Sequence, residues 1–119
     1  TFKIALYTSS ATIDANTTAY SATNEVTGTN YTAGGGSLTN VGVVTSNDTS
    51  STGTGYTDFS DVTWSTATIT ARGALIYKYD GSANPAMIVL DFGSDKTSTS
   101  TFTVTFPSAT NTSAIVRIS

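Results

Sequence analysis

The sequence predicts an all-β fold, an antiparallel β-sandwich of jelly-roll-like or immunoglobulin-like type with about eight strands. Between Tyr56 and Tyr79, β-branched and aromatic residues alternate with threonine and serine, which is typical of strands with one buried and one solvated face. Similar short apolar runs recur along the chain between polar segments. Charged residues make up only 11% of the chain, and serine and threonine supply the missing polarity. Threonine suits strands because its branched Cβ fits the pleated backbone.

The length and composition favour one domain that covers residues 1–119. A chain of this size can bury roughly two-thirds of the surface that its unfolded form exposes. The chain has no cysteine, so this core is expected to form without disulfides. The sequence opens directly on a strand and has no initiator methionine, and we therefore expect a native N-terminal segment to be missing.

The first half of the chain is predicted to contain two strands joined by a long connection. Apolar residues alternate across Phe2–Tyr7, which predicts a strand, whereas Ser9–Thr29 is polar with weak periodicity and predicts an irregular connection. Three glycines at Gly34–Gly36 precede a short strand within Leu38–Val44. Thr45–Gly55 is predicted to be a solvated loop.

The second half is richer in strands. The longest, Thr68–Tyr79, is expected to bend or bulge at Gly73, because glycine in a strand often marks such a site. Gly81–Pro85 is predicted to form a turn. The strands of this half are expected at Tyr56–Phe59, Val62–Trp64, Thr68–Tyr79, Met87–Phe92, Phe102–Phe106 and Ala114–Ile118.

The same alternation assigns side chains to the core. These are Phe2, Ile4, Leu6, Trp64, Ile69, Leu75, Ile88, Leu90, Phe102, Val104, Ile115 and Ile118. An alternative concerns the aromatic residues, because exposed rings could form a platform on which sugars stack. The rings concerned are those of Trp64, Tyr56, Phe59, Tyr77 and Tyr79. Alternating strand aromatics more often belong to the core, and we favour that interpretation.

The sequence predicts no enzyme, no catalytic residue and no bound cofactor. The chain lacks histidine and cysteine, so neither a Ser-His-Asp nor a Cys-His nucleophile can be assembled, and a conventional zinc site is not expected. Gly34–Gly36 lacks the lysine and the strand-loop-helix context of a phosphate-binding loop. We interpret these glycines as a turn before a strand.

Aspartates lie at the ends of predicted strands, in the segments DFSD and DFGSD. Asp58 with Asp61, and Asp91 with Asp95, could in principle form the carboxylate pair of a glycoside hydrolase. Aspartate at a strand end normally accepts turn hydrogen bonds instead. A calcium site built from these oxygens is the alternative, and no metal-ligating residue is assigned. Arg72 is expected to pair with Asp58, Asp61 or Asp91, or else to contact another subunit.

The charge and hydropathy of the chain exclude two classes of partner. Five basic residues against eight acidic ones give a net charge of −3, and the basic residues are dispersed along the chain. No basic patch is therefore expected to bind nucleic-acid phosphates. No apolar run approaches the ~20 residues that a transmembrane helix needs, so no membrane partner is predicted.

Several segments of the chain carry a family resemblance. ALYTSSAT, YTAGG, DVTW, ARGALIY and LDFGSDK follow one another in this order. As a set they resemble a widespread family of small structural proteins encoded by tailed bacteriophages, and the resemblance covers nearly the whole chain. Members of that family usually carry a further N-terminal segment before the first strand.

The resemblance implies a non-enzymatic virion structural protein, located on the phage particle and expected at the capsid surface. The role expected first is that of a capsid decoration or cement protein, which binds the major capsid protein and stabilises the phage head. Self-association as a homotrimer is expected because capsid lattices offer threefold positions. The alternatives are a tail, fibre or head-fibre module, or a host-surface carbohydrate-binding module.

Overall fold

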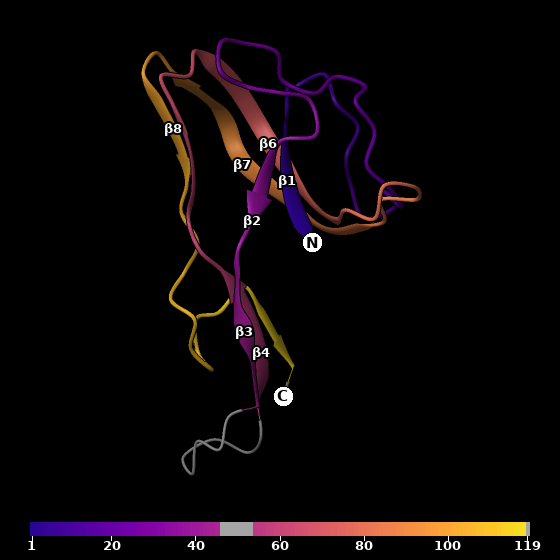
Figure 1. Cartoon of the computed structure of the whole chain (residues 1–119), viewed down its shortest axis with the longest axis vertical. Coiled ribbons are helices and arrows are strands. Elements are labelled where there is room, and N and C mark those ends of the chain that lie inside the picture. Colours follow the sequence, from indigo (N-terminus) through magenta and orange to yellow (C-terminus); the bar gives the residue numbers. More distant parts are fainter. Residues whose placement is uncertain (46–53, 119) are drawn as a thin grey trace. The chain divides into compact units, whose positions relative to one another are not determined.

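The computed structural model describes residues 1–45 and 54–118, and this part of the chain contains strands and no helix (Figure 1). Paired strands run antiparallel, so the all-β prediction is confirmed. The strands are β1 (Phe2–Tyr7), β2 (Gly36–Leu38), β3 (Asn40–Thr45), β4 (Gly55–Phe59), β5 (Val62–Ser65), β6 (Ile69–Lys78), β7 (Ala86–Ser98), β8 (Thr101–Val104) and β9 (Val116–Ile118). Most of the predicted loop Thr45–Gly55 lies outside the described residues.

The chain divides into two units, each built from two separate segments. Unit 1 consists of Thr1–Ser37 and Thr63–Thr103, and unit 2 consists of Leu38–Val62 and the chain from Val104 onward. The four-stranded sheet, in the order β2-β1-β6-β7, belongs to unit 1 except for Leu38 at the end of β2, and the three-stranded sheet β3-β4-β9 belongs to unit 2. A separate ladder joins β5 to β8. The expectation of one sandwich domain over residues 1–119 stays a prediction.

The two central strands of the sheet of unit 1, β1 and β6, are buried on both faces. β1 pairs with β6 in a regular register that sets Ile4 opposite Ile76 and Leu6 opposite Ala74. Successive side chains of a strand point to opposite faces. One face presents Ala5, Tyr7, Leu75 and Tyr77, the other presents Ile4, Leu6, Ala74 and Ile76, and each of these residues is at most 2% exposed.

The long connection between β1 and β2 covers the first of these faces. The partly buried residues that pack on it are Ala11, Ile13 and Tyr20 of the connection, with Ala86 and Val89 of β7. Backbone bonds attach the connection to the sheet, as where Val26 N donates to the Leu6 carbonyl at 2.9 Å. The segment Ser9–Thr29 therefore contains no named strand, as predicted, yet it supplies part of the core of unit 1.

β6 is irregular at the predicted glycine. Its register with β7 shifts between Ala71 and Gly73, so a bulge lies at this point. A Cβ on Gly73 would stand 2.7 Å from the carbonyl oxygen of Leu90, too close for any side chain. The irregularity predicted at Gly73 is confirmed, and its extra residues belong to β7, where residues 92–95 stand opposite Arg72 alone.

β7 is longer than predicted. It continues from the apolar stretch Met87–Phe92 to Ser98, which pairs with Ile69 of β6. The extension has the polar sequence GSDKTS, so it lacks the apolar alternation from which a strand is recognised. Within the described part of the chain, β7 is the last strand on its side of the four-stranded sheet.

Most of the predicted core is interior. Ile4, Leu6, Trp64, Ile69, Leu75, Phe102 and Val104 are buried, whereas Phe2, Ile88, Leu90 and Ile115 are half-buried. The prediction for Ile118 is wrong, because this side chain is 74% exposed. β9 is a three-residue strand at the edge of its sheet, and alternation does not tell whether anything covers the face on which such a residue lies.

Candidate functional site

The first pair of predicted carboxylates serves the fold of unit 2. Asp58 has no exposed surface, and its two carboxylate oxygens accept the backbone N–H groups of Phe59 at 2.8 Å and Ile115 at 3.3 Å. Asp61 accepts the N–H of Phe106 at 2.8 Å. Both aspartates therefore join distant parts of unit 2, which differs from the local turn bonds that the sequence predicted.

The second pair, Asp91 and Asp95, lies on β7 in unit 1, and both residues are exposed. Within residues 1–45 and 54–118, no group of three or more acidic, histidine or cysteine side chains comes together as a metal site would require. The structure therefore does not assemble the calcium alternative from these aspartates.

Arg72 pairs with one of its predicted partners. Its Nε lies 3.1 Å from Oδ1 of Asp91, and the two side chains are 42% and 70% exposed. The same oxygen of Asp91 accepts the N–H of Gly93 at 2.8 Å. The bond from Gly93, followed by the bond and charge of Arg72, lowers the pKa of Asp91 below its ordinary value. The predicted intrachain pair is confirmed.

A pocket of about 300 Å³ lies beside this ion pair. Its lining comes from the end of β1, the start of the long connection, Arg72 and Gly73 of β6, and the middle of β7. The lining residues are Tyr7, Thr8, Ser9, Ala11, Ile13, Arg72, Gly73, Val89, Leu90 and Asp91. All of these belong to unit 1, so one unit forms the whole pocket.

A cluster of hydrogen bonds among polar side chains in unit 1 was not predicted from the sequence. It centres on Glu25, which is only 7% exposed. Its Oε2 accepts the hydroxyl of Tyr20 at 2.6 Å, and its Oε1 accepts both the hydroxyl of Tyr31 at 2.7 Å and the N–H of Gly34 at 2.8 Å. The hydroxyl of Tyr31 in turn accepts the N–H of Leu6 at 2.8 Å.

Two further tyrosines extend this cluster. Tyr77 donates its hydroxyl to the carbonyl of Gly34 at 2.7 Å and stacks on Tyr20 with ring centroids 4.7 Å apart. Tyr7 donates to the carbonyl of Ser21 at 2.6 Å. We call the set Glu25, Tyr7, Tyr20, Tyr31 and Tyr77 the tyrosine network.

Burial raises the pKa of the hydroxyls in the tyrosine network. It raises that of Tyr7 to about 12. The pKa values of Tyr20 and Tyr31 rise further above the ordinary value, because each is desolvated and donates its proton to Glu25. Desolvation also raises the pKa of Tyr77, with the charge of Glu25 as the second cause. The four tyrosine hydroxyls therefore stay protonated at neutral pH, and their hydrogen bonds join the connection to the sheet.

One sequence signal could have indicated this cluster. Glu25 is the only glutamate of the chain and lies in a segment otherwise free of charge, from Ala15 to Gly36. A lone acid among tyrosines is a candidate for a buried hydrogen-bond acceptor. The irregular backbone around it gives no periodicity from which its burial could be predicted.

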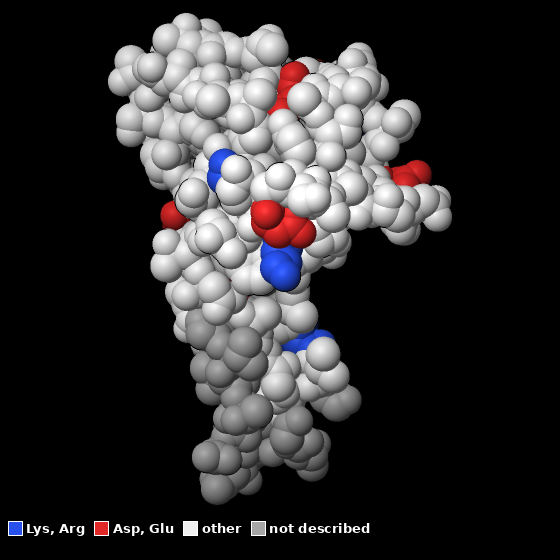
Figure 2. Space-filling view, turned by 45° about the vertical axis from the view of Figure 1, so that its right-hand side comes forward, with Lys and Arg blue, Asp and Glu red and all other residues white. Residues whose placement is uncertain are grey.

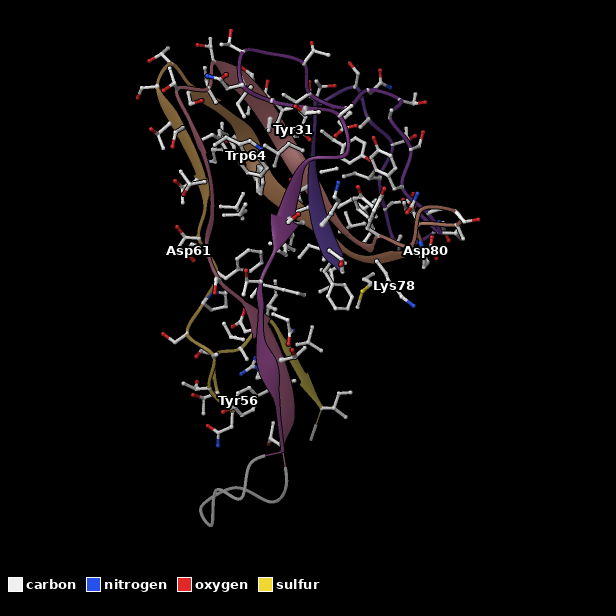
Figure 3. The ribbon with its side chains drawn as sticks, in the orientation of Figure 1. Tyr31, Tyr56, Asp61, Trp64, Lys78 and Asp80 are labelled. Atoms are coloured by element: carbon white, nitrogen blue, oxygen red, sulfur yellow. The ribbon has the colours of Figure 1, made fainter. Side chains whose placement is uncertain are left out.

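The predicted aromatic platform is not assembled. Trp64, Phe59 and Tyr77 are buried, whereas Tyr79 is 46% exposed and lies under the ammonium group of Lys3, 4.5 Å from the ring centroid. Trp64 packs against Tyr31 and Phe102 with centroid distances of 5.8 and 6.2 Å (Figure 3). Trp64 thus belongs to the core of unit 1, as we favoured.

The beginning of β7 exposes apolar surface. Met87 is 51% exposed, and Ile88, Val89 and Leu90 are only half-buried. A second pocket, of about 490 Å³, lies here. Its lining residues are Asp14, Ala15, Thr17, Ala86, Met87, Ile88 and Val89.

Charged groups are few on the face that Figure 2 shows, and near its centre a red group adjoins a blue one; that view has no large patch of one sign. In the described residues, no helix has the length and hydropathy needed to cross a membrane. No protein-family model, curated protein or solved structure matches this chain.

Proposed function

We propose that this chain is a non-enzymatic virion structural protein, a capsid decoration or cement protein that binds the major capsid protein and stabilises the head of a tailed phage. The phage context rests on the resemblance of its sequence segments. The observation that carries an attachment role is the apolar beginning of β7.

This segment has the properties of a contact surface. β7 is the last strand on its side of the sheet. The connection contacts it at Ala86, whose N–H donates to the Thr18 carbonyl at 2.9 Å, and an edge strand beyond such a contact can offer backbone groups to a partner. From Gly81 to Leu90 the sequence contains no charged residue, and Met87 is half exposed. Proteins usually protect exposed edges with charges, so an uncharged apolar edge beside a groove favours a protein partner.

The low charge content of the chain also favours stable attachment to a partner protein. With 11% charged residues, the chain carries few of the lysine and glutamate side chains that interfaces avoid. If the protein self-associates as a homotrimer, three weak contacts to the lattice act together and gain avidity. A ligand that binds only the assembled capsid stabilises it by mass action.

The test uses particles that lack the protein. They are expected to assemble, because the major capsid protein forms the lattice, and to release DNA at a lower temperature than complete particles. Adding back the purified protein should restore the release temperature, with little dependence on salt because few charges are involved. Counting copies by mass spectrometry of complete particles should give hundreds per particle.

Substitutions on β7 test the contact surface. Met87→Asp should weaken rebinding at least about tenfold, because it places a charge in an apolar interface. Thr99→Asp adds the same charge at an exposed turn position and should rebind like the unaltered protein.

Four results would contradict the proposal. Depleted particles with full thermal stability but poor adsorption to cells would favour the fibre or head-fibre alternative. A count of a few copies or tens of copies would favour the tail. Equal rebinding of the Met87→Asp and Thr99→Asp variants would exclude β7 as the contact, and isolated monomers on the particle would exclude the trimer.

A further inference from the structure

The pocket beside the Arg72–Asp91 pair has the chemistry of a binding site. Arg72 uses only its Nε toward Asp91, and within the described ranges its two terminal nitrogens meet no acceptor. Asp91 is held through Oδ1 by Arg72 and Gly93, and its Oδ2 meets no donor in those ranges. Free donors and a free acceptor therefore stand side by side at the pocket.

Both groups are held in place before any ligand arrives. The N–H of Gly93 fixes the carboxylate of Asp91, and the carboxylate orients the guanidinium of Arg72. A side chain whose geometry is set in advance loses less entropy when it binds a ligand.

The arrangement selects among ligand classes. Arginine only donates hydrogen bonds and a carboxylate only accepts them, whereas a hydroxyl does both. Two neighbouring hydroxyls of a sugar can therefore receive from Arg72 and donate to Asp91 at the same time. A free anion is disfavoured, because the negative charge of Asp91 lies 3.1 Å from the guanidinium that would bind it.

The remaining lining suits a sugar ring. Thr8 and Ser9 add hydroxyl groups at the pocket, while Ile13 and Val89 add apolar surface for the C–H groups of the ring. The volume of about 300 Å³ is at the lower end for a small-molecule site. It fits one or two sugar units rather than a long chain.

We propose that this pocket binds a neutral saccharide through a vicinal pair of hydroxyls, with Arg72 as donor and Asp91 as acceptor. The site does not need the aromatic platform, which is absent from this unit. It adjoins the proposed capsid contact, because Val89 lines both pockets, but it does not rest on that proposal. Binding of a single unit of about a dozen non-hydrogen atoms should be weak, in the millimolar range.

The test is a titration of the ¹⁵N-labelled protein with methyl α-glycosides of glucose, mannose and galactose, each up to about 50 mM, a range suited to such affinities. At least one glycoside should shift the amide signals of Ser9, Gly73 and Asp91 in a saturable way. Its analogue lacking one of the two recognised hydroxyls should not bind, because the site would then hold an unpaired polar group.

Variants of the pair decide whether these residues are responsible. Arg72→Lys keeps the charge but loses the planar fork, and it should weaken binding at least about tenfold. Asp91→Asn keeps the size but replaces the free acceptor oxygen by a donor, and it should have a similar effect. Lys96→Gln is the matched control, because Lys96 lies on the same strand outside the pocket.

Each of the following results would overturn the proposal. They are the absence of saturable shifts with every glycoside, shifts that map to another part of unit 1, and unchanged binding by Arg72→Lys and Asp91→Asn. Displacement of the glycoside by acetate or inorganic phosphate would instead assign the pocket to anions. None of these outcomes bears on the stability of capsids, so the two proposals fail separately.

Discussion

The tyrosine network and the Arg72–Asp91 pair show two opposite uses of a carboxylate within unit 1. Glu25 is 7% exposed and accepts three hydrogen bonds from groups of its own chain. The side chain of Asp91 is 70% exposed and leaves one oxygen without a protein donor in the described residues.

This difference in burial predicts different effects when the tyrosine network and the Arg72–Asp91 pair are altered. A buried polar group must find its partners inside the protein, and removal of either side is costly. An exposed pair gains little from its own contact, because water competes for both charges. We therefore expect changes in the network to affect stability, and changes in the pair to affect binding.

The largest loss of stability is expected from substitution of Gly35, which follows Gly34, a hydrogen-bond donor to Glu25. Its φ is +72°, and a Cβ would lie 1.8 Å from the carbonyl oxygen of Ile4. Gly35→Ala should lower the free energy of unfolding by about 5 kcal/mol, because a backbone atom must move to admit the methyl group. Urea unfolding followed by tryptophan fluorescence measures this value.

Gly81→Ala is the matched control for this substitution. Gly81 has a similar φ of +77°, but nothing lies within 4 Å of the position that its Cβ would occupy. Only the backbone strain remains, and the expected loss is about 1 kcal/mol. Equal losses in both variants would show that contact with β1 is unimportant.

The next largest loss of stability is expected from substitution of Glu25. Glu25→Ala leaves two tyrosine hydroxyls and the N–H of Gly34 without their acceptor, and should cost about 4 kcal/mol. Glu25→Gln retains one acceptor oxygen and should cost about half as much. The exposed Asp95 provides the control, since Asp95→Asn should stay within about 0.5 kcal/mol of the unaltered protein.

The contrast also explains how much of the structure could be predicted from the sequence. Phe2–Tyr7 was located to the residue, and the bulge at Gly73 was anticipated, because alternation and glycine are local signals. The burial of Glu25 depends on contacts with Tyr20, Tyr31 and Gly34 across a connection without periodicity. No local pattern records such contacts.

The edge strands β7 and β9 show the same limit of prediction from local sequence patterns. The polar second half of β7 is a strand because β6 offers it backbone partners, which its own residues do not reveal. Ile118 was predicted to be buried from its apolar side chain, although it ends an edge strand and is exposed. The pairing of Arg72 with an aspartate was predicted, but the pocket beside it depends on three separate segments.

Alkaline pH is expected to lower the free energy of unfolding progressively, because the tyrosines of the network ionise. A tyrosine whose pKa is raised by folding ionises first in the unfolded chain, at an ordinary pKa of about 10. Stability should therefore be constant up to about pH 10 and fall as the pH rises through the folded pKa of Tyr7, about 12. Urea midpoints between pH 8 and pH 12 should show this fall.

A comparison with Tyr7→Phe tests the cause of the alkaline effect. Removal of this hydroxyl should make the fall in urea midpoint shallower over the same range, because one raised pKa has been eliminated. A midpoint that stays constant to pH 12 in the unaltered protein would show that the network hydroxyls ionise as readily in the folded state as in the unfolded state.

The smallest effect on stability is expected at the Arg72–Asp91 pair. Arg72→Gln should leave the urea midpoint unchanged within error, because both partners are solvated. The substitution should nevertheless raise the pKa of Asp91, measured from its carboxyl ¹³C shift. The rise should be partial, since the N–H of Gly93 is the larger cause of the lowered pKa and remains in place. A full return to the ordinary value would show that Arg72 alone fixes the carboxylate, and the pocket would then lose its acceptor geometry with any change at that residue.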